Sequence, residues 1–74
     1  MKNITIKYGS DVREVTVDNG TTVGALISDS TNKVVLGYGD NVQGLIGGVA
    51  QPNDVVVPDG VTLVIENKAN SKAN

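Results

Sequence analysis

Apolar and polar residues alternate over Asn3–Tyr8 and again over Arg13–Val17. A period of two places the apolar side chains of each run on one face, as in a half-buried β-strand. The turn-forming residues Gly9-Ser10-Asp11 separate the two runs, and Asp18-Asn19-Gly20 follows the second. The pattern therefore predicts an antiparallel hairpin at the start of the chain.

The next stretch, Thr21–Ser30, changes to a helical period. Val23, Leu26 and Ile27 are spaced i, i+3 and i+4, so they share one face of a helix. A threonine at position 21 or 22 can cap the helix by accepting a hydrogen bond from a free backbone amide. Because a helix this short is marginal alone in water, we expect it to lie across a sheet.

Short apolar runs alternate with turn residues in the second half of the chain. Lys33–Leu36 predicts a single helical turn, ended by Gly37 in the left-handed conformation. Four extended runs follow, with a Gly47-Gly48 hairpin turn after the first and Pro58-Asp59-Gly60 before the last: Val42–Ile46, Val49–Gln51, Val55–Val57 and Val61–Glu66.

This order of elements predicts an α+β fold, in which a mixed sheet of four or five strands carries one main helix across one face. The first and last strands have the clearest alternation, and they can pair in parallel at the centre of the sheet. We expect one domain over residues 1–66 and a flexible tail over residues 67–74. The predicted core is Ile4, Ile6, Val15, Val17, Val23, Leu26, Ile27, Leu36, Val42, Leu45, Leu63 and Ile65.

Composition argues against catalysis. The chain contains no His and no Cys, which removes the usual general base near neutral pH and the thiolate nucleophile. Asp40, Asp54 and Asp59 fall in predicted loops, but each is explained by a role in a turn. We therefore expect no catalytic, cofactor-binding or metal-binding residue, no cofactor and no enzymatic activity.

Charge and hydropathy argue against nucleic acids and membranes as binding partners. Six basic and eight acidic residues give a formal charge of −2, and the basic residues are scattered. Nucleic-acid binding needs a basic surface that neutralises several phosphates, so we do not expect it. No apolar run is long enough for a membrane span, and the N-terminus lacks the apolar region of a signal peptide. We expect a soluble, cytoplasmic protein of undetermined oligomeric state.

Two glycine-containing loops, Gly37–Asn41 and the Gly47-Gly48 turn, hold the candidate contact residues. The first loop lacks the Gly-Lys-Ser/Thr ending of a phosphate-binding loop, which favours a structural turn. Its tyrosine is either a lid on the core, the favoured interpretation, or an exposed contact. The candidate partner contacts are Tyr38, Gly39, Asp40, Gly47 and Gly48.

Four consecutive segments resemble the ubiquitin-like β-grasp. They are the N-terminal hairpin, a T-x-V-x-x-L-I helix start at Thr21–Ile27, a V-x-x-x-I-G-G-V segment at Val42–Val49 and a P-D-G-V-T-L-V-I closing strand at Pro58–Ile65. Over residues 3–66 the chain looks most like the small sulfur carriers, namely the molybdopterin-synthase small subunit and the thiamine-pathway carrier. The resemblance implies a carrier that acts through a C-terminal Gly-Gly carboxylate. This chain has Ser71–Asn74 at that position instead. Its only Gly-Gly is Gly47-Gly48, inside a predicted hairpin.

From these patterns we expect a non-catalytic protein-interaction module that binds a larger protein partner. The alternative is a decoration or cement subunit of a viral capsid or similar assembly, which would place the protein in a virion. The third hypothesis is a degenerate sulfur carrier. It ranks last because the Gly-Gly ending through which such carriers act is replaced in this chain.

Overall fold

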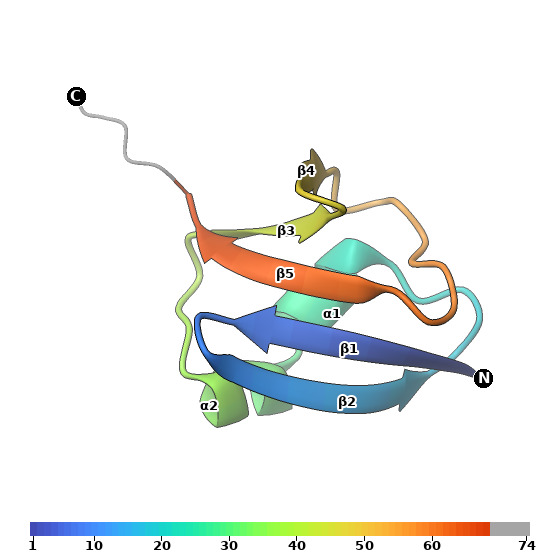
Figure 1. The fold of residues 1–74 in the computed structure, drawn as a ribbon, viewed down its shortest axis with the longest axis horizontal. Coiled ribbons are helices and arrows are strands. Elements are labelled where there is room, and N and C mark those ends of the chain that lie inside the picture. The colour runs from blue at the N-terminus through green and yellow to red at the C-terminus, as the bar shows by residue number, and fades with distance from the viewer. Residues whose placement is uncertain (69–74) are drawn as a thin grey trace.

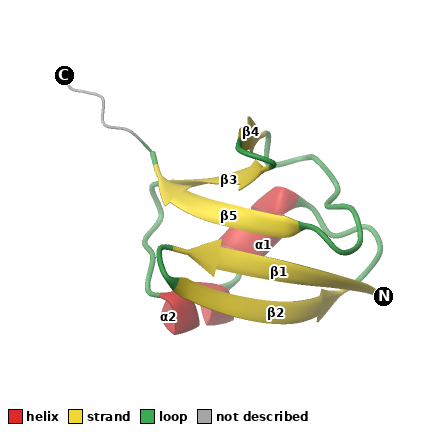
Figure 2. Cartoon of the chain, in the orientation of Figure 1, coloured by secondary structure: helices red, strands yellow, loops and turns green. Residues whose placement is uncertain are grey.

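The computed structural model of the chain describes residues 1–68. One five-stranded sheet has the strand order β2-β1-β5-β3-β4. In Figure 1, α1 lies behind the sheet and α2 lies below the edge strand β2, and Figure 2 shows the same arrangement by secondary structure. The α+β architecture expected from the sequence is confirmed.

The predicted N-terminal hairpin is formed by β1 (Lys2–Tyr8) and β2 (Asp11–Val17). The two strands pair without interruption from Lys2 opposite Val17 to Tyr8 opposite Asp11, around a two-residue Gly9-Ser10 turn. Such a pairing fixes the register, so the side chains of each strand alternate between the helix-covered face and the open face.

The helical region is broken into α1 (Val23–Ser28) and α2 (Ser30–Leu36) by Asp29. The Thr22 hydroxyl accepts a hydrogen bond from the Ala25 amide at 3.2 Å, which confirms the predicted cap. The Asp29 carboxylate caps α2 in the same way, and Gly37 ends α2 with a φ of 82°. The helix start, break and stop are therefore all set by local side chains.

The second half of the chain supplies β3 (Val42–Ile46), β4 (Val49–Gln51) and β5 (Thr62–Asn67). β5 pairs in parallel with β1 and antiparallel with β3, so the predicted pairing of the first and last strands is confirmed. The run Val55–Val57 forms no strand, but Val56 makes an isolated bridge with Thr22.

The core lies between the helices and the sheet. Its buried apolar side chains are Ile4, Ile6, Val23, Leu26, Ile27, Leu36, Tyr38, Val42, Val57, Leu63 and Ile65. The predicted core residues Val15 and Val17 are only half-buried at its edge. Val57, which the sequence pattern did not single out, is fully enclosed at 0% exposure.

The prediction that Leu45 belongs to the core is wrong. Val42, Gly44 and Ile46 occupy the helix-covered face of β3, and alternation therefore turns Leu45 to the open face. A side chain at Gly44 would lie 2.9 Å from both Leu63 Cδ1 and Val23 Cγ1. Because only glycine fits there, the inward position of this strand carries no apolar signal in the sequence.

The last strand, β5, extends one residue beyond Glu66. Asn67 still belongs to β5 and pairs with Val42, and the Lys68 amide donates to the Asn41 carbonyl at 2.9 Å. Residues 69–74 of the predicted tail lie outside the described residues. No helix in residues 1–68 has the length and apolar character needed to cross a membrane.

Candidate interaction surface

The five predicted contact residues form two groups at opposite ends of β3. Tyr38, Gly39 and Asp40 precede the strand, whereas Gly47 and Gly48 form the hairpin turn that follows it. The structure therefore does not bring the five residues together into one site.

Tyr38 belongs to the core. Its side chain is 5% exposed, and its ring centroid lies 5.5 Å from that of Tyr8. The Tyr38 hydroxyl donates a hydrogen bond to the Ile27 carbonyl at 2.8 Å. Burial, together with the nearby charge of Asp29, raises the pKa of Tyr38 above its usual value. The core-lid interpretation matches this position, so Tyr38 offers almost no surface to a partner.

The other predicted contacts are exposed. The Asp40 carboxylate forms an ion pair with Lys33 of α2, and the hydrogen bond and charge of Lys33 hold the pKa of Asp40 below its usual value. Gly47 and Gly48 adopt φ angles of 60° and 80°, as expected for a tight hairpin turn. These residues remain accessible at two separate corners of the molecule.

Among residues 1–68, no three carboxylates lie close enough to form a metal site. Asp59 instead accepts a hydrogen bond from the Asn3 amide at 2.9 Å, and Asp40 is paired with Lys33. Both aspartates therefore hold loops in place in the described part of the chain.

The face of the sheet away from the helices carries a different arrangement. Register places one residue from each strand side by side across the whole sheet. This cross-strand row consists, from β2 to β4, of Val12, Lys7, Val64, Leu45 and Ala50. Directly opposed side chains on one face of a sheet lie in contact distance, so the row is continuous.

Apolar side chains dominate the row. Val12 is 57% exposed, and Val64 and Leu45 are half-buried next to each other on the neighbouring strands β5 and β3. Lys7 is exposed between Val12 and Val64. In residues 1–68 neither helix covers this face, which is turned toward the viewer in Figure 1. This face therefore carries partly exposed apolar side chains from neighbouring strands.

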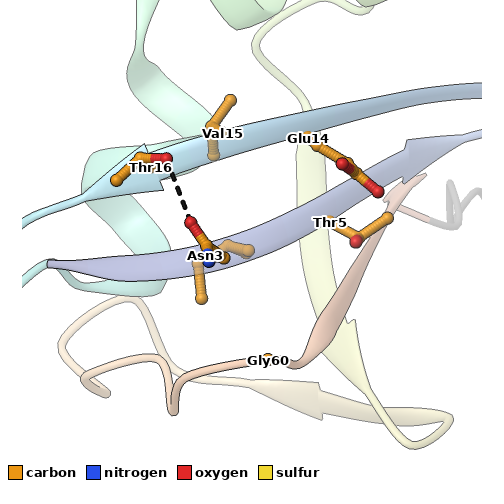
Figure 3. Close-up of a pocket in the computed structure, with 7 residues that line it drawn as sticks. Asn3, Thr5, Glu14, Val15, Thr16 and Gly60 are labelled. Atoms are coloured by element: carbon orange, nitrogen blue, oxygen red, sulfur yellow. Dashed lines mark hydrogen bonds between the residues drawn. The ribbon is translucent and has the colours of Figure 1, made fainter.

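A shallow polar hollow borders the row along β1 and β2. Figure 3 shows Asn3 and Thr16 side by side, with Thr5 and Glu14 further along the same two strands. The Thr16 hydroxyl donates to Asn3 Oδ1 at 3.1 Å. These polar side chains form a rim, as is usual around the apolar centre of a protein–protein interface.

The sequence analysis missed this row as a unit. It assigned Leu45 to the core, although Leu45 lies on the open face beside Val64. Outward valines at positions 12 and 64 were a usable signal, yet only the register brings Lys7, Val64 and Leu45 into line.

Structural comparison identifies the architecture. The ubiquitin of Caldiarchaeum subterraneum superposes with a TM-score of 0.71 over 96% of this chain and 98% of that chain, at 20% sequence identity. The fold is the ubiquitin-like β-grasp. A ubiquitin-like domain from Arabidopsis thaliana matches over 99% of this chain and 83% of its own, with a TM-score of 0.69 and 20% identity.

A third similar structure is ATBAG1, solved in complex with HSP70. It covers 90% of this chain and 40% of that chain, with a TM-score of 0.74 and 16% identity. No family model and no curated relative matches the sequence. At these identities the likeness establishes the fold, and it does not distinguish the sulfur-carrier branch from other ubiquitin-like domains.

Proposed function

We propose that this chain is a non-catalytic protein-interaction module that docks on a larger protein through the open face of its sheet. The observation that carries the proposal is the cross-strand row, in which Leu45 and Val64 form an apolar centre on a face that no described helix covers. Association of proteins is driven largely by burial of apolar surface of this kind.

The surroundings of the row suit a protein partner better than a small ligand. The row crosses all five strands, and the hollow beside it on β1 and β2 is polar. A second, wide-open hollow is lined by Lys7 and Val64 of the row together with Tyr8 and Glu66. Small-molecule sites are usually concave and mostly apolar, whereas protein interfaces combine an apolar centre with a polar rim. The complex of ATBAG1 with HSP70 supports a protein partner for a chain that contains this fold.

The non-catalytic part of the proposal rests on residue types. With no His and no Cys in the sequence, neither the usual proton-transfer group nor a thiol nucleophile is available. The row itself contains a single ionisable side chain, Lys7, and no second group that could act with it as an acid–base pair.

The test compares variants of equal chemistry on two sides of the molecule. Leu45→Arg and Val64→Arg place a charge at the centre of the row. Val34→Arg is the matched control, because Val34 is 81% exposed on α2. All three variants should keep a cooperative thermal transition. Tagged proteins are then used to capture partners, and each captured partner is re-tested in purified form.

We expect a partner that binds the wild type and Val34→Arg but not Leu45→Arg or Val64→Arg. Undiminished binding by both row variants would show that the partner uses another surface. Sizing of the purified protein addresses the alternatives: a regular multimer would favour the accessory-subunit reading. A C-terminal adenylate or thiocarboxylate, formed with ATP and an adenylating enzyme, would favour the carrier.

A further inference from the structure

The connection from β2 to α1 is a tight turn at Asp18–Thr21. The Thr21 amide donates to the Asp18 carbonyl at 3.1 Å, which makes Asn19 and Gly20 the two central residues. Both central residues are exposed. An Asn-Gly pair is thus held at the tip of a loop, in contact with solvent.

The Asn19 side chain and the Gly20 amide nitrogen, which are neighbours in this turn, are both free of hydrogen bonds in residues 1–68. A Cβ added to Gly20 would meet no atom within 4 Å, so the space beside its Cα is open. Gly20 also presents no side chain of its own to obstruct approach of the Asn19 side chain.

We propose that Asn19 is a site of spontaneous deamidation through a cyclic imide. In mild base the Gly20 amide nitrogen loses its proton and attacks Cγ of Asn19. A new C–N bond closes a five-membered succinimide, while the bond from Cγ to the side-chain nitrogen breaks and ammonia leaves. Water then opens the ring at either carbonyl and leaves an aspartyl or an isoaspartyl residue at position 19. Solvent supplies every co-reactant.

Other asparagines in the described chain provide internal comparisons. Asn41 precedes Val42, a β-branched residue at the start of β3, and Asn53 precedes Asp54. Asn53 is further restrained, because its carbonyl accepts from the Gly24 amide at 2.9 Å. Asn32 is buried at 3% exposure, with its side chain bonded to the Leu26 carbonyl. Asn19 differs from Asn41 and Asn53 because a glycine follows it, so no side chain stands beside the backbone nitrogen that would attack.

The isoaspartyl product would alter the entry to α1. In that product the main chain runs through the side-chain carbon, which lengthens the turn by one carbon atom. Two residues later, the Thr21 carbonyl accepts from the amide of buried Val57 at 3.0 Å, and Thr22 caps α1. Lengthening the turn should disturb these two contacts, whereas a simple aspartate on the exposed tip should not.

The experiment incubates the full chain in mildly alkaline buffer at physiological temperature and follows each asparagine by peptide mapping. Gly20→Ala is the matched variant, because the structure leaves room for the methyl group and Gly20 is outside the left-handed region. We expect the mass increase of amide-to-acid conversion to appear first at Asn19, severalfold faster than at Asn41 or Asn53. Gly20→Ala should slow it severalfold.

A second measurement separates the products by chromatography. The isoaspartyl form should melt at a lower temperature than the wild type, whereas Asn19→Asp should melt at the wild-type temperature. Equal rates in wild type and Gly20→Ala would overturn the proposal. So would an unmodified Asn19 in the folded chain under conditions where a peptide of the same turn sequence reacts.

Discussion

Two buried polar side chains hold the break between α1 and α2. The Asn32 side chain donates to the Leu26 carbonyl at 3.0 Å, and the Tyr38 hydroxyl donates to the Ile27 carbonyl. Both carbonyls lie in the last turn of α1, where helix termination leaves carbonyls short of helical partners. The Leu26 carbonyl also accepts from the Asp29 amide at 3.4 Å. Because buried polar groups are costly when unpaired, these two side chains make the break compatible with a packed interior.

At the residue scale, Tyr38 predicts an alkaline limit to stability. Its pKa in the folded state is raised from the reference value of 10.0 by burial and by Asp29. A raised folded pKa stabilises the fold fully below pH 10, and that contribution is lost as pH rises through the folded pKa. Tyr38→Phe cannot ionise, although it loses a hydrogen bond worth about 0.5–1.5 kcal/mol.

We therefore expect Tyr38→Phe to start less stable at neutral pH and to lose less stability than the wild type in strong base. Urea unfolding midpoints across this pH range provide the measurement, with Tyr8→Phe as the control for general alkaline effects. Parallel declines in wild type and Tyr38→Phe would contradict the role of Tyr38.

Leu26 carries a second prediction at this scale. Its side chain is 4% exposed between α1 and the sheet. Leu26→Ala should lower the free energy of unfolding by about 2–5 kcal/mol through lost burial and the resulting cavity. Small domains have only about 5–15 kcal/mol in total, so the variant should be partly unfolded at physiological temperature.

The control for Leu26→Ala is Val34→Ala, whose side chain is 81% exposed on α2. A surface change of this kind should alter stability by no more than about 0.5 kcal/mol. Thermal melts of both variants check the prediction, and similar shifts in the two would mean that Leu26 is not central to the core.

At the element scale, sequence patterns predicted those features that leave a local mark. The alternation in β1 and β2, the Thr22 cap and the Gly37 stop all depend on residues within a few positions of each other. The inward phase of β3 was missed because Gly44 fits against Leu63 and Val23, residues far away in the sequence. The buried position of Val57 was also missed, because that segment is held by Thr21, a residue far away in the sequence.

The candidate surface was harder to foresee than the elements. Its members come from all five strands, and only the registers of four strand pairs align them. Patterning alone shows which residues of one strand share a face, but it does not give the neighbour across a long-range pairing. The contacts predicted from the sequence lie in two glycine-containing loops, and the structure places these loops at opposite ends of β3.

The end of β5 gives a prediction about an element boundary. A chain that ends at Glu66 loses the pairing of Asn67 with Val42 and the hydrogen bond from Lys68 to the Asn41 carbonyl. Each such hydrogen bond contributes about 0.5–1.5 kcal/mol, so this chain should melt at a lower temperature. A chain that ends at Lys68 keeps both contacts and should melt as the full chain does.

The two truncations differ by only two residues, so they serve as controls for each other. Thermal melting followed by circular dichroism is sufficient. If the chain ending at Glu66 were as stable as the chain ending at Lys68, the last two described residues would not contribute to the sheet.

At the scale of the whole molecule, the two ends of the described chain meet in the middle of the sheet. β5 pairs with β1 on one side and with β3 on the other, and it places Leu63 and Ile65 in the core. No contiguous half of the sequence therefore contains both the central strand pair and the helix that covers it. Such an arrangement links the stability of all elements.

We accordingly expect unfolding in a single cooperative transition, as is usual for small domains with one core. Far-ultraviolet circular dichroism follows the sheet and helices, whereas tyrosine fluorescence follows Tyr8 and Tyr38, whose rings are 5.5 Å apart. The urea midpoints from the two signals should coincide. Leu63→Ala should shift both midpoints together, because Leu63 is fully buried at 0% exposure on the strand that joins the two halves of the sheet. A fluorescence transition that separates from the circular dichroism transition would show that the tyrosine end of the core can open by itself, and the sheet would then not behave as one unit.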